Sequence, residues 1–222
     1  MNISLFQKKI TKGFLEFLLI VVGVTIALWL ENVAEDMKER EIEQEYLISF
    51  ENDVSKDIKR LEISIKNNKA ILSKVEKFLQ DLINAQLTAN NLMENIGSIT
   101  SYDYFTPDDF TLTSIRESGD FRLLRNDKVK REILELKRSY DQVEVLQINF
   151  QNALDNQIIP LIIENVNMVN GQLVNPSFIS DHRLASMVGY VHSDTQGRIK
   201  QYQASKRAAE SLLVLLQTTI NF

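Results

Sequence analysis

The stretch FLEFLLIVVGVTIALWLEN, residues 14–32, decides how this chain is organised, because it is almost wholly apolar over the length of a membrane helix. A helix over residues 13–30 would rise about 27 Å, close to the roughly 30 Å thickness of the hydrocarbon core of a bilayer. Trp29 falls at its outer end, where aromatic residues are enriched at the membrane surface. The stretch therefore predicts a transmembrane anchor at residues 13–30.

Charge on the two sides of the anchor predicts its orientation. Lys8, Lys9 and Lys12 precede it, whereas acidic residues outnumber basic ones in the segment that follows, residues 31–46. Basic flanking residues stay in the cytoplasm, so the lysines would lie at the cytoplasmic surface of the membrane and Trp29 at the opposite surface. We therefore expect a cytoplasmic tail at residues 1–12 and a single-pass inner-membrane protein whose C-terminal domain is periplasmic.

A cleaved signal peptide is the alternative interpretation of the same stretch. Thr25, Ile26 and Ala27 loosely resemble the small-residue site at which signal peptides are cut. The apolar run continues beyond them through Leu30, however, and a charged helical pattern follows without any turn signal. These features favour an uncleaved signal anchor over a cleaved leader.

Beyond the anchor the pattern is helical. The chain has 222 residues with only 7 Gly and 3 Pro, a composition that favours long helices over many-turned sheets. Apolar residues recur at steps of three and four in three segments, residues 47–82, 129–158 and 184–220. Neither Gly nor Pro interrupts residues 32–86, so the anchor is expected to continue through a charged helical stalk, residues 31–46, into the first segment.

These segments predict an all-α fold, in which a single N-terminal transmembrane helix continues into a long helix of an antiparallel helical bundle. The bundle would occupy residues 47–222, with its three long helices running up, down and up. Whether residues 181–221 form one helix or two stays open, because two glycines interrupt that segment. Core positions are expected on the apolar seams, among them Leu61, Val75, Ile133, Phe150 and Leu213.

Capping and breaking residues mark the expected helix ends. Thr106 followed by Pro107 predicts the start of a short helix, and Gly119 predicts its end. Asn126 is suited to cap the second long helix, and Pro160 should kink or end that helix.

Residue types that usually carry chemistry are sparse. The absence of cysteine excludes disulfides, thiolate metal sites and cysteine nucleophiles. His182 and His192 have no acidic residue at metal-ligand spacing on a shared face. The net charge of −5 has the wrong sign for a protein that neutralises phosphates. We therefore expect no enzyme activity, no catalytic, cofactor-binding or metal site, no nucleic-acid partner and no small-molecule substrate.

Glu16, Gly23 and Ala27 form the candidate contact site of the anchor. At helical spacing they share one face, and small residues four apart let membrane helices approach closely. Because ionisable groups are costly inside a bilayer, Glu16 is either a carboxylate that faces a partner helix or an interfacial residue neutralised by Lys12. The stripe predicts a contact in a homo-oligomer or with a membrane protein partner, and chance occurrence of Gly and Ala is the alternative.

Two further features have both a structural and a functional interpretation. Asn68 interrupts an apolar seam, where it would either fix helix register or lie near the bundle surface, and the surface position is favoured. Basic residues gather at residues 116–131 around a helix start, which suits either anion binding or a tight corner between helices. The corner is favoured, because Phe121 and Leu124 can close the end of the bundle there.

Three stretches carry a family resemblance. They are EFLLIVVGVTIALWLEN at residues 16–32, EREIEQEYLISFENDVSKDIKRLE at residues 39–62 and SIRESGDFRLLRNDKVKREILELKRSYD at residues 114–141. Together they resemble a domain-of-unknown-function family of small single-pass membrane-anchored helical proteins common in Bacteroidota. The similarity covers most of the chain, and it implies an anchor, a helical exterior domain and no established activity.

Two classes of function remain. The first is an oligomerising interaction or accessory protein whose bundle presents a helical surface in the periplasm. The second is a ligand-binding sensory ectodomain, which would have to signal through a membrane partner because only about a dozen residues stay in the cytoplasm by the charge rule. The identity of proteins that co-purify in mild detergent would separate the two.

Overall fold

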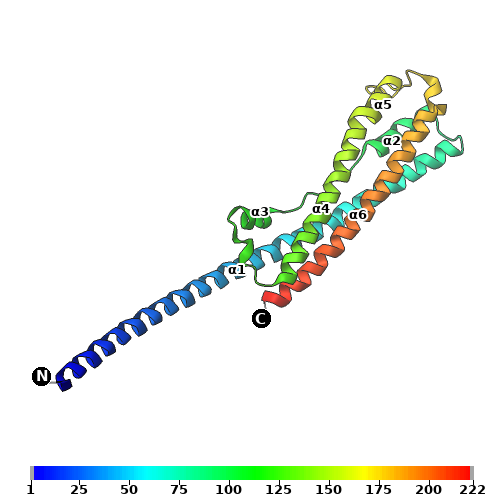
Figure 1. Cartoon of the computed structure of the whole chain (residues 1–222). Coiled ribbons are helices and arrows are strands. Elements are labelled where there is room, and N and C mark those ends of the chain that lie inside the picture. Colours follow the sequence, from blue (N-terminus) through cyan, green and yellow to red (C-terminus); the bar gives the residue numbers. More distant parts are fainter. Residues whose placement is uncertain (1–2, 221–222) are drawn as a thin grey trace.

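The computed structural model describes residues 3–220, with side chains from Glu16 onward except that of Asn90. Within this part of the chain the regular structure is helical and no strand forms, which confirms the all-α prediction. The single long helix at the N-terminus projects away from a bundle that holds the other helices (Figure 1).

Helix α1, Ile3–Ile83, is continuous over 81 residues, which corresponds to about 120 Å at 1.5 Å per residue. Its two glycines, Gly13 and Gly23, both lie toward the N-terminal end, and no proline interrupts it. The helix stops where the Asn84 N–H donates to the Gln80 carbonyl and Ala85 takes a left-handed φ of 52°. The predicted continuity of anchor, stalk and first long segment is therefore found.

Helix α2, Ala89–Thr100, was not predicted from the apolar pattern. The Thr88 N–H donates to the side-chain oxygen of Asn91 at 2.8 Å, half of a capping box that opens the helix. Helix α3, Phe110–Glu117, ends at Gly119, whose φ of 78° is the left-handed conformation expected there. The predicted start at Pro107 is wrong, because contacts with α1 described below hold the preceding residues in an extended path.

The second long segment begins after a short 3-10 turn, η1, Asp120–Leu123. Asn126 caps helix α4, Asp127–Ala153, by accepting hydrogen bonds from the Lys128 and Val129 N–H groups, as predicted. The helix then passes through a π-helical turn, η2, Leu154–Ile158, into α5, Ile159–Asn165. Pro160 therefore changes the hydrogen-bond pattern of the preceding turn without ending the helix at that point, because a proline lacks the N–H that the regular pattern needs.

The chain turns back at the far end of α5. An isolated bridge between Val166 and Leu173 and a 3-10 turn, η3, Pro176–Ser180, lead into α6, His182–Ile220. This last helix is one continuous element of 39 residues. The question whether the C-terminal segment forms one helix or two is thereby answered in favour of one.

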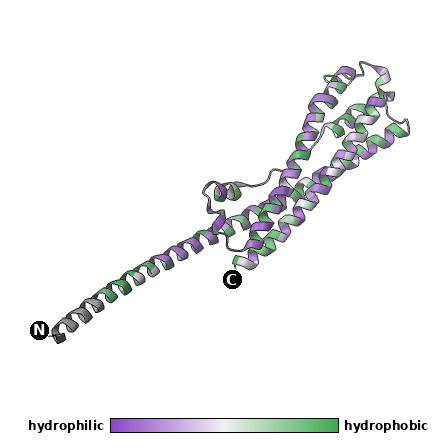
Figure 2. Cartoon of the chain, in the orientation of Figure 1, coloured by the Kyte–Doolittle hydropathy of each residue, from purple (hydrophilic) through white to green (hydrophobic). Residues whose placement is uncertain are grey.

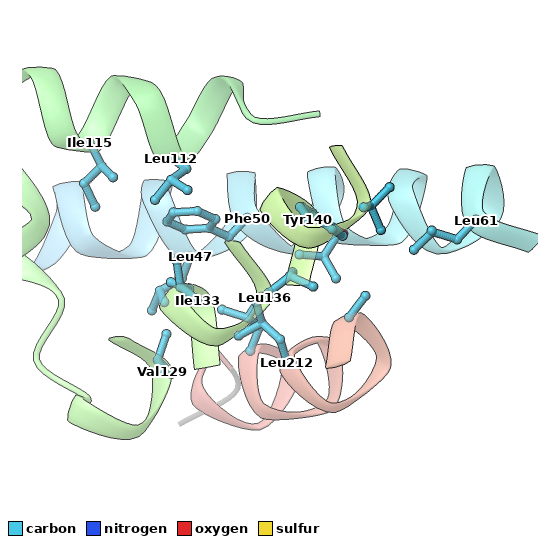
Figure 3. Packing of buried hydrophobic residues seen from close by; sticks show 14 of the residues in the cluster. Leu47, Phe50, Leu61, Leu112, Ile115, Val129, Ile133, Leu136, Tyr140 and Leu212 are labelled. Carbon is cyan, nitrogen blue, oxygen red and sulfur yellow. The ribbon is translucent and has the colours of Figure 1, made fainter. Parts of the chain in front are cut away.

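Two apolar clusters show how the long helices run. At the stalk end of the bundle, Leu47 of α1 lies in one cluster with Val129 of α4 and Leu216 of α6. Figure 3 labels Leu47, Val129 and other members of this cluster. At the far end, the second cluster joins residues from the other half of each helix, namely Val75, Phe150 and Leu184. Helices α1 and α4 therefore run in the same direction, and α6 runs opposite to both.

This arrangement differs from the predicted succession of up, down and up. Residues 84–126, which include α2 and α3, carry the chain back to the stalk end before α4 begins. A connection of that length permits either direction for the next helix, so the apolar pattern alone does not determine it. Four of the five predicted core residues are buried, whereas Leu213 is only half-buried because Leu212 and Leu216 face the core instead.

Candidate functional site on the projecting helix

The N-terminal part of α1 lies outside the bundle and is apolar. Figure 2 shows a green stretch of this helix that no other element covers. An 18-residue window in it has a mean hydropathy of 2.1, and none of that window is buried against the rest of the chain. By length and composition this helix is able to cross a membrane.

The predicted contact residues of the anchor are all exposed. Glu16 and Ala27 are open to the surroundings, and a Cβ atom added to Gly23 would meet nothing within 4 Å. Trp29 is 62% exposed at the other end of the stretch. The described chain therefore leaves this face without an internal partner, and its role in a helix contact stays a prediction. The side chains of Lys8, Lys9 and Lys12 lie outside the described residues.

A polar side chain in the apolar stretch of α1 is paired within the helix. The Thr25 hydroxyl donates to the Val21 carbonyl at 2.8 Å, one turn earlier in the same helix. A hydroxyl that is paired in this way avoids the cost of an unsatisfied donor in hydrocarbon. Thr25 is therefore compatible with a lipid-exposed helix.

The stalk is held against the bundle by arginines from the turn before α4. Arg125 pairs with both Asp36 and Glu43 of α1, and Arg122 lies 3.8 Å from Glu39. The hydrogen bond from Arg125, and then the one from Arg40, hold the pKa of the Asp36 carboxyl below its usual value. These pairs occupy two of the arginines that were candidates for anion binding. They support the corner interpretation of residues 116–131.

A segment across the outside of the bundle, residues 101–111, is tied to carboxylates of α1. The Asp108 N–H donates to Asp57 at 2.9 Å, and both the backbone N–H and the hydroxyl of Thr111 donate to Asp53. Lys56 bridges Asp53 and Asp108. These bonds explain why α3 begins at Phe110 and not at Pro107.

Asp57 is the most deeply placed of these carboxylates. Its side chain is almost fully buried, and burial raises its pKa to about 6, although the N–H of Asp108 and the charge of Arg60 act in the opposite direction. A cavity of about 40 Å³ lies beside it between α1, α3 and α4, and Tyr140 of α4 lines the cavity. The Tyr140 hydroxyl is buried close to Asp57, and burial followed by the charge of Asp57 raises the pKa of Tyr140.

We expect Asp57→Asn to stabilise the fold at pH 8 and to lose that advantage as the pH falls toward 4. The folded pKa of about 6 lies above the ordinary aspartate value of 3.8, so the folded chain binds more protons than the unfolded chain between these values. The contribution of Asp57 to the free energy of unfolding is thus greatest below pH 4, and it is lost as the pH rises through 6. Asparagine keeps the acceptor for the Asp108 N–H without the charge.

The measurement is a series of urea titrations of the full-length protein in mild detergent between pH 4 and pH 8, with the free energy of unfolding compared between variant and wild type. Asp141→Asn is the control, because Asp141 is an exposed partner of Lys137 on the same side of the bundle. A difference between Asp57→Asn and wild type that does not change with pH would contradict the assigned titration of Asp57.

A buried polar layer separates the two apolar clusters. Asn68 is fully buried, and its side-chain amide donates to the carbonyls of Ser64 and Asp103 at 2.8 Å each, so the favoured surface position is wrong. The Tyr202 hydroxyl donates to the side-chain oxygen of Gln147 at 2.6 Å. Asn68 therefore ties residues 101–111 to α1, whereas the bond between Tyr202 and Gln147 joins α6 to α4.

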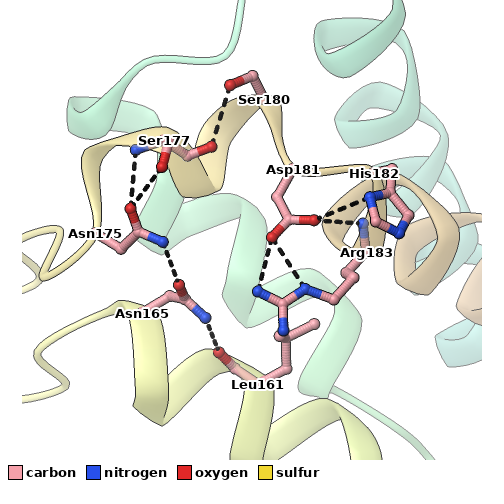
Figure 4. A network of polar contacts seen from close by, with 8 residues as sticks. All are labelled: Leu161, Asn165, Asn175, Ser177, Ser180, Asp181, His182 and Arg183. Atoms are coloured by element: carbon pink, nitrogen blue, oxygen red, sulfur yellow. Dashed lines mark hydrogen bonds and ion pairs between the residues drawn. The ribbon is translucent and has the colours of Figure 1, made fainter.

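The far end of the bundle is closed by a side-chain network (Figure 4). The amide of Asn175 donates to the side-chain oxygen of Asn165, whose own amide donates to the Leu161 carbonyl. Asp181 accepts from the backbone and guanidinium of Arg183 at the start of α6. These contacts fix the reversal between α5 and α6.

Neither the arrangement of possible metal ligands nor a comparison with known proteins indicates a further site in the described part of the chain. Among the residues with described side chains, no group of three or more His, Asp or Glu is placed to hold a metal ion. His192 lies 3.7 Å from Glu76, and His182 lies 3.5 Å from Asp181. No family model, curated protein or solved structure matches the chain.

Sequence reasoning located the exposed stripe but missed the carboxylates under residues 101–111. The stripe was visible because its spacing lies within one helix. Asp53 and Asp57 fall on the same side of α1 as the apolar seam, and acidic residues at core positions were the available signal. Acidic residues at core positions indicate that some buried group bonds them, but they do not identify that group.

Proposed function

We propose that this is a membrane-anchored periplasmic protein in which α1 holds a helical bundle outside the cytoplasm, and that it acts as an oligomerising interaction or accessory subunit. The observation that carries the proposal is the apolar face of α1, which projects from a folded bundle and has no internal partner. An apolar helix in water is costly, so this segment requires lipid or another protein. The family resemblance implies the same architecture, an anchor followed by a helical exterior domain.

The proposed role is one of binding, not of catalysis. The side chains that the bundle buries together are engaged in structural pairs, as with Asp53 and Thr111 or Asn68 and Asp103. The exposed apolar stripe of Glu16, Gly23 and Ala27 is instead available to a second helix in the membrane. We infer that partner capture takes place there, with the lysines and Trp29 fixing the depth of the anchor.

We expect full-length protein to stay in the membrane fraction after alkaline extraction, and a reporter fused to its C-terminus to be active only outside the cytoplasm. The reason is the basic N-terminal flank, which is retained on the cytoplasmic side. Immunoblotting and reporter activity give the two readings, and a fusion lacking residues 1–30 is the control. A soluble form that begins near Leu28, or an active cytoplasmic reporter, would refute the anchor and its orientation.

The second candidate function is a ligand-binding sensory ectodomain that signals through a membrane partner. The observation that favours it is the cavity beside the buried carboxyl of Asp57, which Tyr140 also lines. At about 40 Å³ the cavity has room for a few water molecules or the head of a small ligand. Proteins captured in mild detergent separate the two functions, because an accessory subunit retains a partner without added ligand.

A further inference from the structure

The apolar face of α1 follows a heptad spacing through the anchor and into the stalk. Starting from Ile20, the steps alternate strictly between three and four residues for three heptads. Such a repeat is the pattern by which two helices wind around each other in a left-handed coiled coil. We call this line of residues the α1 seam, and its members are Ile20, Gly23, Ala27, Leu30, Ala34, Met37 and Glu41.

The α1 seam faces away from the bundle. Arg125 and Arg122 contact the stalk at Asp36, Glu39 and Glu43, and at about 100° per residue these positions lie on the side of the helix roughly opposite the seam. Met37, on the seam, is 66% exposed. The bundle therefore leaves the whole length of the seam open to another helix.

We propose that the occupant of the α1 seam is the α1 seam of a second copy of this chain, packed parallel and in register through both the anchor and the stalk. The inference rests on the proposed function and deepens it, because it names the partner and the alignment. Inside the membrane, Gly23 and Ala27 let the two backbones approach closely. Outside it, Ala34 and Met37 bury apolar surface that a single exposed stalk leaves in water.

Charge complementarity favours a second copy in this alignment. In a parallel pair the residue before each a position contacts the residue five places later on the partner helix. This rule joins Arg40 of one copy to Glu45 of the other, which is an attraction, and Val33 to Lys38, which is neutral. Both Arg40 and Glu45 are exposed on the single chain. Arg40 pairs with Asp36 of its own helix through Nε, which leaves its other guanidinium nitrogens to reach such a partner.

Carboxylates bound the seam at both ends. Glu16 falls one step of four before Ile20, and Glu41 falls one step of four after Met37. Two copies would bring like charges together at these ends, and Arg40 of each copy, paired with Glu45 of the other, lies beside Glu41 and offsets the repulsion there. The two bundles, docked on the outer sides of the stalks, would then diverge beyond Glu45 without competing for the same space.

The chain contains no cysteine, so single cysteines introduced into the stalk report the contact without background. We expect Ala34→Cys and Met37→Cys to form disulfide-linked dimers several-fold faster than Asn32→Cys and Glu35→Cys when native membranes holding the full-length protein are oxidised. All four positions are exposed on the single chain, and only the first two lie on the seam. A disulfide between identical positions also requires a parallel, in-register pair.

A second variant tests the membrane part of the seam without altering the stalk. Adding Gly23→Leu to Met37→Cys should reduce dimer formation several-fold, whereas adding Val22→Leu, which points elsewhere, should leave it unchanged. Faster crosslinking at position 32 or 35 would overturn the seam while leaving oligomerisation by another face intact. Equal, slow crosslinking at all four positions would overturn pairing of two copies, and membrane extraction would still test the proposed function separately.

Discussion

Phe150→Ala is expected to lower the free energy of unfolding by about 3–5 kcal/mol, the range for truncating a buried aromatic residue. The Phe150 ring is fully buried in the far-end cluster. It also carries the Arg198 guanidinium, whose central carbon lies 4.2 Å from the ring centroid. The substitution thus leaves a cavity and removes the aromatic face that the buried cation contacts.

The measurement is the urea midpoint of full-length protein in mild detergent, followed by circular dichroism of the helices. Ile148→Ala is the matched control, because this residue lies on the same helix and is 51% exposed. It should change the free energy of unfolding by no more than about 0.5 kcal/mol. Equal losses for the two variants would mean that the faces of α4 are assigned incorrectly.

The burial of Phe150 was predicted correctly, because it depends only on the spacing of apolar residues within one helix. Leu61, Val75, Ile133 and Phe150 are buried because residues three and four apart share one face of a helix, whatever that face packs against. The prediction for Leu213 was wrong by one position. Several leucines and valines are adjacent in this segment, so the apolar spacing fits either Leu212 or Leu213 as the core residue. The buried residues there are Leu212 and Leu216.

The direction of each long helix and the partners of its buried polar side chains depend on contacts between residues far apart in the sequence. The apolar periodicity of a single helix carries no information about such contacts. Asn68 pairs with the carbonyl of Asp103, which comes from a segment without helical pattern, so its burial was not visible. The same holds for the parallel course of α1 and α4, since the long connection between them fits either direction. The candidate stripe on α1 needed no such contact, because its residues belong to one helix, and its role in a helix contact stays a prediction.

Asp194→Ala is expected to cost about 3–5 kcal/mol, the range for removing one partner of a buried ion pair. Arg198 is fully buried, and its Nε donates to Asp194 one turn earlier at 2.7 Å. Its Nη1 has no hydrogen-bond partner among the described residues, and Nη2 reaches only the Thr195 hydroxyl. Asp194 is therefore the only carboxylate paired with this charge in the described part of the chain.

Asp141→Ala is the control for this experiment, because its pair with Lys137 is more exposed and should contribute no more than about 1 kcal/mol. Both variants remove one carboxylate from an ion pair four residues apart on a single helix, so they differ chiefly in burial. Urea titration at constant pH compares them directly. Equal and small losses would show that Arg198 reaches water once Asp194 is absent.

Replacing both members of the buried pair separates the cost of a stranded charge from the value of the pair itself. Asp194→Leu combined with Arg198→Met should recover most of the stability lost in Asp194→Ala, because no uncompensated charge remains and the apolar side chains avoid the desolvation penalty. The buried pair would then serve to hold α6 in one register against Phe150 more than to stabilise the bundle. A double variant as unstable as Asp194→Ala would instead show that the pair contributes stability that apolar packing cannot replace.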